Sequence, residues 1–211
     1  MCGIHGFFTT NQNQDNNSSL IRKMVSSTNH RGPDYNGIEN IHPVYFGHNR
    51  LSIIDLNPEA NQPMNFGKYW IVFNGEIYNY KEIRQELKEN GIVFSTVSDT
   101  EVILKSYDFF GEKCVNKFIG MWAFSIYNME EKSLFCSRDR FGIKPFYYLQ
   151  HENNLYFSSE IKSIKLTPYF SSELNLSQIN RGLQLGWVGY KNETYYSCIQ
   201  SLEPGHNLVY K

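Results

Sequence analysis

Short apolar runs with the period of β-strands recur along this chain, and turn-forming residues separate them. The run with the highest β propensity covers 69–73 (YWIVF) and is followed by Asn74-Gly75, a dipeptide typical of tight turns. Further strands are predicted at 4–9 and 44–54 and near 207–210. After Gly120 the spacing of apolar runs and turn residues indicates antiparallel hairpins, with strands at 121–127, 133–137, 145–149 and 155–158.

Other segments have the 3.6-residue period of amphipathic helices. Two residue pairs, Asn79 with Glu82 and Ser98 with Glu101, have the spacing of a helix capping box. Gly91 suits the end of the helix that begins at Asn79. Loops are expected at 11–17 and 55–64 and a Gly-Pro turn at 30–34. The predicted helices begin at Ser18, Asn79, Ser98 and Asn175 and end near Thr28, Gly91, Gly111 and Leu185.

This order of elements predicts an α+β protein in which antiparallel sheets are covered by a few helices. Aromatic residues make up 16% of the 211 residues, which favours β structure, and the chain is long enough to bury a sizeable core. No internal repeat or linker is visible, so we expect one domain over 1–211.

Composition argues against several classes of function. The formal net charge is −1, which favours neither nucleic acid nor an acidic membrane as a partner. The four cysteines are widely spaced and form no C-x-x-C pair, so neither a zinc site nor a disulfide scaffold is expected. No signal peptide or long apolar run is present, so we expect a reduced, cytoplasmic protein.

The clearest candidate for chemistry is Cys2. Removal of Met1 would leave a thiol and a free α-amine on the same residue, and the amine has an ordinary pKa of roughly 7.7–8.0. Such an amine can take the proton of the thiol, so nucleophile and base would share one residue. The alternative is an ordinary buried cysteine at the start of a strand.

Further polar groups are also candidates. They are Arg50 in the middle of its predicted strand, the run Asn74-Gly75-Glu76 after the strongest strand, and Asp99 at a helix start. Each also has a purely structural interpretation: a surface ion pair, a plain turn, and a charge favoured by the helix dipole. Taken one at a time, none of them decides between these alternatives.

Together with their neighbours these residues form a series of phrases that belongs to a known family. In order along the chain they are MCGIHGFF, HRGPD, GHNRLSIIDL, QPM, FNGEIYNY, SDTEVIL, GMWAFSIYN, RDRFGIKPFYY and FSSEIK. The chain closely resembles the N-terminal glutaminase domain of glutamine-hydrolysing asparagine synthetases. That domain is a class II glutamine amidotransferase, an N-terminal-nucleophile hydrolase.

The resemblance implies a four-layer αββα sandwich with two antiparallel sheets inside. It implies that Cys2 attacks the side-chain amide of L-glutamine and that the Asn74 side chain and the Gly75 N–H hold the oxyanion. The remaining residues implied to bind the substrate are Arg50 for the carboxylate, Asp99 for the ammonium, and Glu76 with the backbone at Ile53 and Ile54 for the pocket wall. The resemblance assigns no catalytic role to His5 or His30.

The family's proteins continue into a synthetase domain that this sequence lacks, and ATP and Mg would belong there. In this domain no cofactor and no metal are expected. The ammonia acceptor, the presence of a synthetase domain in cis or in trans, and a homodimer of the full-length protein stay open. Alternatives are a stand-alone glutaminase, a glutamine-binding regulatory module, and a related amidase with another substrate. Residues 138–144, with Arg138, Asp139, Arg140 and Lys144, are expected to form a structural ion-pair network.

Overall fold

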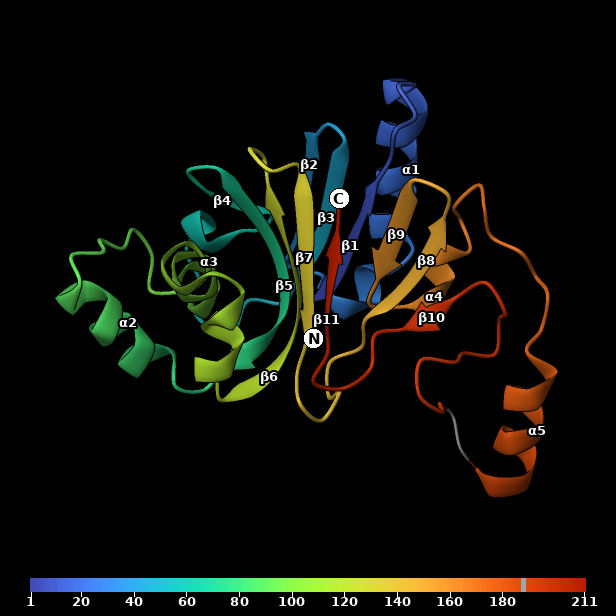
Figure 1. Ribbon diagram of the computed structural model, residues 1–211. Helices are drawn as coiled ribbons and strands as arrows, with labels where there is room; N and C mark the ends of the chain where they lie inside the picture. Colours follow the sequence, from blue (N-terminus) through green and yellow to red (C-terminus); the bar gives the residue numbers. More distant parts are fainter. Residues whose placement is uncertain (187–188) are drawn as a thin grey trace.

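Two antiparallel β-sheets lie face to face in the computed structural model, which describes residues 1–186 and 189–211 (Figure 1). The first sheet has the strand order β10-β8-β9-β1-β3-β2 and the second the order β11-β7-β6-β5-β4. In chain order the strands are β1 Gly3–Phe8, β2 Tyr35–Ile41, β3 Val44–Arg50, β4 Met64–Phe66, β5 Tyr69–Ile77, β6 Gly120–Asn128, β7 Ser133–Arg138, β8 Tyr147–His151, β9 Asn154–Ser158, β10 Gln200–Ser201 and β11 Asn207–Tyr210.

Helices cover the outer face of each sheet. α2 and α3 lie beside the second sheet, and α1 and α4 lie beside the first (Figure 1). The α-helices are α1 Gln14–Ser26, α2 Tyr80–Glu89, α3 Asp99–Phe110, α4 Ile161–Ile164 and α5 Leu176–Leu185, and the 3₁₀ helices are Asn29–Arg31, Pro58–Ala60 and Gly111–Lys117.

Three hydrophobic cores match the four layers. The core between the sheets includes Ile4, Val72 and Phe157, all fully buried. A second core joins the outer face of the second sheet to α2 and α3, and a third joins the first sheet to α1 and α4. Because successive side chains of a strand point to opposite faces, central strands such as β1 and β5 contribute to an inner and an outer core. The four-layer αββα arrangement expected from the resemblance is confirmed.

The Asn74-Gly75 turn predicted after the strongest strand is wrong. β5 continues to Ile77, and Asn74 and Gly75 pair with Ala123 and Trp122 of β6. A Cβ on Gly75 would lie 2.2 Å from the Met121 carbonyl oxygen, so this glycine permits close approach of two strands.

The other differences concern element ends and edge strands. The strand expected to reach residue 54 ends at Arg50, and α1 begins at Gln14 because the Asn13 side chain caps it by accepting from the Asn16 N–H. The expected cap of α3 is confirmed, since the Ser98 side chain accepts from the Glu101 N–H. The edge strands β2, β4 and β10 were not predicted, because β2 is polar and largely exposed and β4 and β10 have only three and two residues.

Candidate active site

One cavity gathers every residue that the sequence singled out as a site residue. It lies where the N-terminus, the end of β3, the last part of β5 and the start of α3 meet. Its lining includes Cys2, Arg50, Ile53, Ile54, Asn74, Gly75, Glu76 and Asp99. Met1, Leu51, Gln62, Thr100, Met121 and Lys144 also line it. Residues up to 143 positions apart in sequence therefore share one concave surface.

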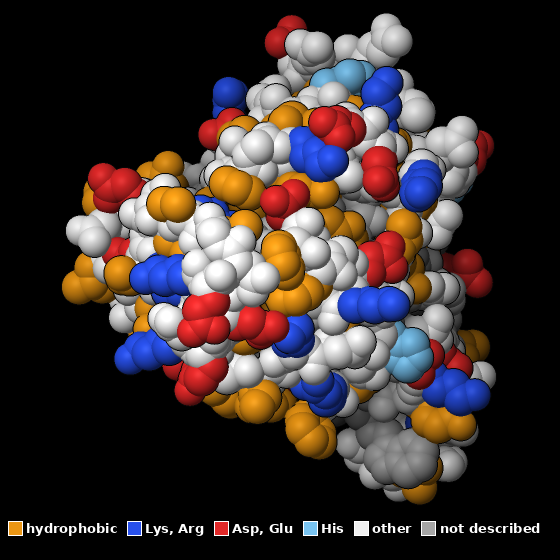
Figure 2. Space-filling model, turned by 60° about the vertical axis from the view of Figure 1, so that its left-hand side comes forward, with side chains coloured by type: hydrophobic (Ala, Val, Ile, Leu, Met, Phe, Trp, Pro, Cys, Tyr) orange, Lys and Arg blue, Asp and Glu red, His pale blue; other side chains and the backbone are white. Residues whose placement is uncertain are grey.

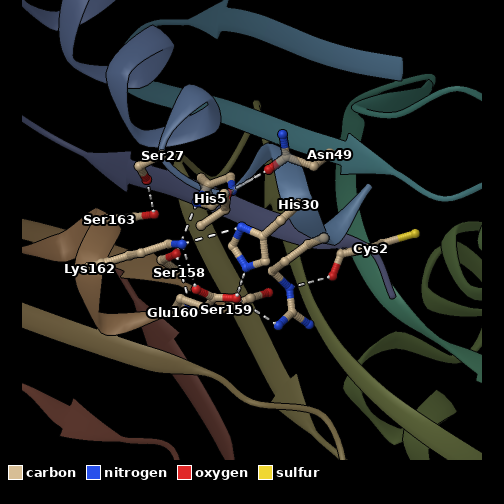
Figure 3. Close-up of polar contacts among 12 residues, drawn as sticks. Cys2, His5, Ser27, His30, Asn49, Ser158, Ser159, Glu160, Lys162 and Ser163 are labelled. Atoms are coloured by element: carbon tan, nitrogen blue, oxygen red, sulfur yellow. Dashed lines mark hydrogen bonds and ion pairs between the residues drawn. The ribbon is translucent and has the colours of Figure 1, made fainter. Parts of the chain in front are cut away.

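Cys2 is held at the start of β1 by contacts on both sides. Its Sγ lies 3.4 Å from the Leu51 nitrogen, which donates to it, and 3.6 Å from the Leu51 carbonyl oxygen. The Cys2 carbonyl accepts a hydrogen bond of 2.9 Å from Arg31 Nε. In Figure 3 the sulfur points away from the polar cluster around His5. The backbone of Cys2 is thus anchored to the 3₁₀ helix Asn29–Arg31 while its sulfur stays on the cavity side.

The Cys2 thiol is in a setting that favours its protonated form. Burial raises the pKa of this thiol, and the Asp99 carboxylate raises it further. The Leu51 backbone, the terminal amine and Arg50 lower the pKa, each by less than burial raises it but by more than Asp99 does, so the net shift is upward. A thiol of this kind needs a neighbouring base before it can act as a nucleophile at neutral pH.

Asn74 brings an unused donor to the cavity. Its side chain is 1% exposed, yet its Nδ2 makes no hydrogen bond within the described part of the chain. Val72, two residues earlier, packs between the sheets, so strand alternation turns Asn74 to the same inner face, toward the sheet that follows Cys2. Buried amide groups without a hydrogen-bond partner are rare and destabilising. Such an unpaired donor is typical of a side chain that binds a ligand.

The Gly75 N–H points in another direction, toward the open edge of β5. The N–H of Phe73 donates to Gln62 Oε1 at 2.6 Å, and the N–H of Ile77 donates to Asp99 Oδ2 at 3.1 Å. Both acceptors lie at the edge of β5 opposite β6. Backbone N–H groups of alternate residues point to the same edge of a strand, so the N–H of Gly75 points to this edge as well. Since Gln62 and Asp99 both line the cavity, the Gly75 N–H lies between two of its walls.

Arg50 connects the cavity to the loop of residues 51–61. Its side chain is buried, its Nη1 donates to the Asn57 carbonyl at 3.1 Å and to Asn61 Oδ1 at 2.5 Å, and its Nη2 donates to the Asp55 carbonyl. A guanidinium has five N–H donors, so Nε–H and one Nη2–H have no acceptor in the described part of the chain. These two donors are on adjacent atoms, the arrangement that binds a carboxylate in a bidentate manner.

Asp99 supplies a buried acidic group. It is the first residue of α3, where the helix dipole favours negative charge, and it is 5% exposed. Burial raises its pKa to about 6, although backbone donors at Ile77, Asp99 and Thr100 act against the increase. Within the described residues no Lys or Arg forms an ion pair with this carboxylate, so a bound cation would find an unpaired acid here.

The remaining site residues complete the wall. Glu76 shares the inner face of β5 with Asn74, and Ile53 and Ile54 lie in the loop that Arg50 holds. Gln62 was not predicted as a site residue, although it belongs to the phrase QPM; its Nε2 donates to Thr100 Oγ1 at 3.2 Å. Gln62 thereby links the 51–61 loop region, β5 and α3.

Neither histidine considered above lines the cavity. His5 is fully buried, and burial lowers its pKa to about 4. Its ring nitrogens contact Ser158 at 2.9 Å and Asn49 at 2.9 Å (Figure 3). His30 instead lies 2.8 Å from Glu160, which also binds Arg31 (Figure 3).

The expected ion-pair network at 138–144 is wrong. Among the described residues no acidic and basic pair from this segment comes within salt-bridge distance. Asp139 accepts from backbone N–H groups of Trp122, Phe141, Ile143 and Lys144, because it closes a tight turn. Arg138 donates to the carbonyl oxygens of Gly142, Lys144 and Leu202.

Metal sites, membrane-spanning helices and strongly charged surfaces are the features that would indicate other classes of protein. The described residues hold no cluster of His, Cys, Asp and Glu side chains suited to a metal ion. In the same part of the chain no helix is long and apolar enough to cross a membrane. Charged side chains of both signs are interspersed over the face drawn in Figure 2.

The fold is that of amidotransferases whose structures are known. A glutamine phosphoribosylpyrophosphate amidotransferase from Bacillus subtilis superimposes with a TM-score of 0.66 over 78% of this chain and 43% of that chain, at 20% sequence identity. A family model described as a glutamine amidotransferase domain matches residues 1–211. This chain therefore belongs to the glutamine amidotransferase domain family.

Sequence relatives place it near the asparagine synthetases. An asparagine synthetase [glutamine-hydrolyzing] 1 of Bacillus subtilis is 45% identical over 214 residues, which cover 99% of this chain and 33% of the relative. An amidase, chry2, of Gibberella zeae is 31% identical over 99% of this chain and 32% of its own length. The chain thus spans about a third of these two relatives and corresponds to the amidotransferase domain related to the asparagine synthetase N-terminus.

Proposed function

We propose that this domain hydrolyses L-glutamine to glutamate and ammonia through a thioester on Cys2, after removal of Met1. The observation that carries the proposal is the single cavity that contains a thiol, an orphan amide donor and two oppositely charged groups. The unused Arg50 donors suit the substrate carboxylate, and the unpaired Asp99 carboxylate suits its ammonium. Free glutamine carries both of these charges and a neutral amide at its other end.

The reaction begins with transfer of the Cys2 thiol proton to the α-amine of the same residue. The sulfur then attacks the amide carbon, and the Asn74 amide and the Gly75 N–H hold the resulting oxyanion. The tetrahedral intermediate collapses as its carbon–nitrogen bond breaks, and the α-amine returns the proton so that ammonia leaves. Water then attacks the thioester, glutamate leaves, and the thiol is restored.

We further propose that the ammonia passes to an ATP-dependent synthetase domain of the asparagine-synthetase type, in cis or in trans. The support is the identity of 45% to an asparagine synthetase three times as long. ATP and Mg would bind that second domain. A stand-alone glutaminase is the alternative to this transfer, and a glutamine-binding module is an outcome of the test below.

The test uses protein whose N-terminus has been established by mass spectrometry. Protein that begins at Cys2 should release glutamate from glutamine, and Cys2→Ala should bind glutamine without releasing glutamate. A panel of amides that lack either the carboxylate or the ammonium should be poor substrates. Glutamine binding without turnover by the unmodified, processed protein would instead identify a regulatory module, and turnover of simple amides would identify an amidase of another specificity.

A further inference from the structure

Lys144 lines the same cavity but has no part in the reaction described so far. Its side chain is 5% exposed, which is unusual for lysine. The backbone of Lys144 is held on both sides. Its N–H donates to Asp139 Oδ2 at 3.0 Å, and its carbonyl oxygen accepts from Arg138 Nε at 2.7 Å. The side chain extends from this anchored backbone and lines the cavity.

The end of this side chain reaches the residue that precedes the nucleophile. Lys144 Nζ donates to the Met1 Sδ at 3.3 Å, and no other hydrogen bond of this ammonium is formed within the described chain. Met1 and Cys2 share a peptide bond and line the same cavity as Lys144, so the ammonium and the nitrogen that becomes the α-amine belong to one site. Removal of Met1 would take away the thioether and leave the ammonium facing that amine and the thiol.

We propose that Lys144 is a positioning residue for the nucleophile, whose positive charge keeps the Cys2 α-amine neutral and favours the thiolate. The inference rests on the proposed function, because the amine is the base of that reaction. A nearby cation disfavours protonation of an amine and favours ionisation of a thiol. Both effects act in the direction that catalysis needs at neutral pH.

The other charges around Cys2 make such a cation useful. Asp99 from α3 and Glu76 from β5 bring negative charge, and the Asp99 carboxylate raises the pKa of the Cys2 thiol. Arg50 from β3 lowers the pKa of this thiol by more than Asp99 raises it, but burial keeps the net shift upward, so a second cation would offset the effect of burial. Arg31 contacts the Cys2 carbonyl, and its charge is balanced by Glu160 at 3.1 Å.

Lys144 also responds to the same surroundings. Burial lowers its pKa, and Arg31 lowers it further, while the thiolate form of Cys2, Asp139 and Glu76 raise it. Because Cys2 and Glu76 both act on the pKa of Lys144, the ammonium is electrostatically coupled to the thiol and to an acidic wall of the cavity. This is the coupling that the proposal requires.

The experiment compares Lys144→Met with Lys144→Arg in protein that begins at Cys2. The rate of Cys2 alkylation by iodoacetamide and kcat/KM for glutamine are measured as functions of pH. With Met, the acidic limb of kcat/KM and the midpoint of alkylation should both move up by about one pH unit, the size expected for one charge at close range in a partly buried site. Arg should restore both. Lys68→Met removes the same charge just before β5, at the end of that strand away from the cavity, and should move neither.

Superimposed profiles for wild type and Lys144→Met would overturn the inference, even if turnover were slower. If the Met variant does not fold, Lys144→Gln serves in its place and is judged by the same two limbs. The alkylation midpoint does not depend on glutamine turnover. An upward shift of that midpoint in a processed protein that cannot hydrolyse glutamine would retain the role of Lys144 and refute the proposed function.

Discussion

Replacement of Asp99 by Asn should improve folding and impair glutamine binding in the same protein. The carboxylate is 5% exposed, and burial raises its pKa from 3.8 to about 6. The folded protein therefore binds more protons than the unfolded chain between about pH 4 and pH 6, so the free energy of unfolding falls as the pH rises through that range. Above about pH 6 the buried Asp99 carboxylate is charged, and it lowers the free energy of unfolding by an amount that no longer changes with pH.

The size of both effects follows from the structure. A pKa difference of about two units corresponds to about 3 kcal/mol, and Asn loses part of this because an amide oxygen is a weaker acceptor for the Ile77 N–H than a carboxylate. We expect Asp99→Asn to be about 1–3 kcal/mol more stable at pH 7.5. Loss of a charge-assisted bond of roughly 1.5–3 kcal/mol should weaken glutamine binding roughly 10- to 150-fold.

Both quantities are measurable in the Cys2→Ala background, where glutamine is not consumed. Urea unfolding at pH 4.5 and pH 7.5 gives the stability difference, which should shrink at the acidic pH, and calorimetry at pH 7.5 gives the affinity. Asp108→Asn, an exposed position on the same helix, should change neither. A variant at Asp99 that is destabilised at pH 7.5, or that binds glutamine as well as its parent, would refute this account of the acid.

Three further variants test separate parts of the cavity. Asn74→Ala should lower kcat about 10²–10³-fold with little change in KM, because its amide is needed only by the oxyanion, and steady-state kinetics should separate the two constants. Arg50→Lys should raise KM for glutamine at least tenfold and expose the 51–61 loop to proteolysis, since Lys cannot serve three loop acceptors and a carboxylate together. Gly75→Ala should lower the melting temperature by several degrees, because its Cβ would meet the Met121 carbonyl; unchanged melting would show that the strands can separate there without cost.

The sequence predicted the layered α+β fold, and the residues that it singled out line one cavity, for different reasons. The inner strands carry enough apolar residues to be recognised locally, and the site residues belong to phrases typical of a family. What failed depended on long-range pairing. Asn74-Gly75 favours a turn when considered alone, but pairing with β6 keeps both residues in a strand, and only in that strand do their donors face the cavity.

The roles of the candidate residues stay predictions, and the structure adds what local patterns could not contain. The three donors that Arg50 directs into its own loop depend on carbonyl groups up to eleven residues away. Lys144 was expected in a structural network, because its neighbours in sequence are charged. Its ammonium instead meets the chain terminus 143 residues earlier, a contact that no local pattern predicts.

The most direct test of the central claim is to stop the reaction with acid during turnover and weigh the N-terminal peptide. Protein that begins at Cys2 should carry the added mass of one glutamyl group on that residue, in a form released by hydroxylamine, while protein that retains Met1 should not. Steady release of glutamate with no such adduct, or an adduct on any other residue, would contradict the assignment of Cys2 as the nucleophile.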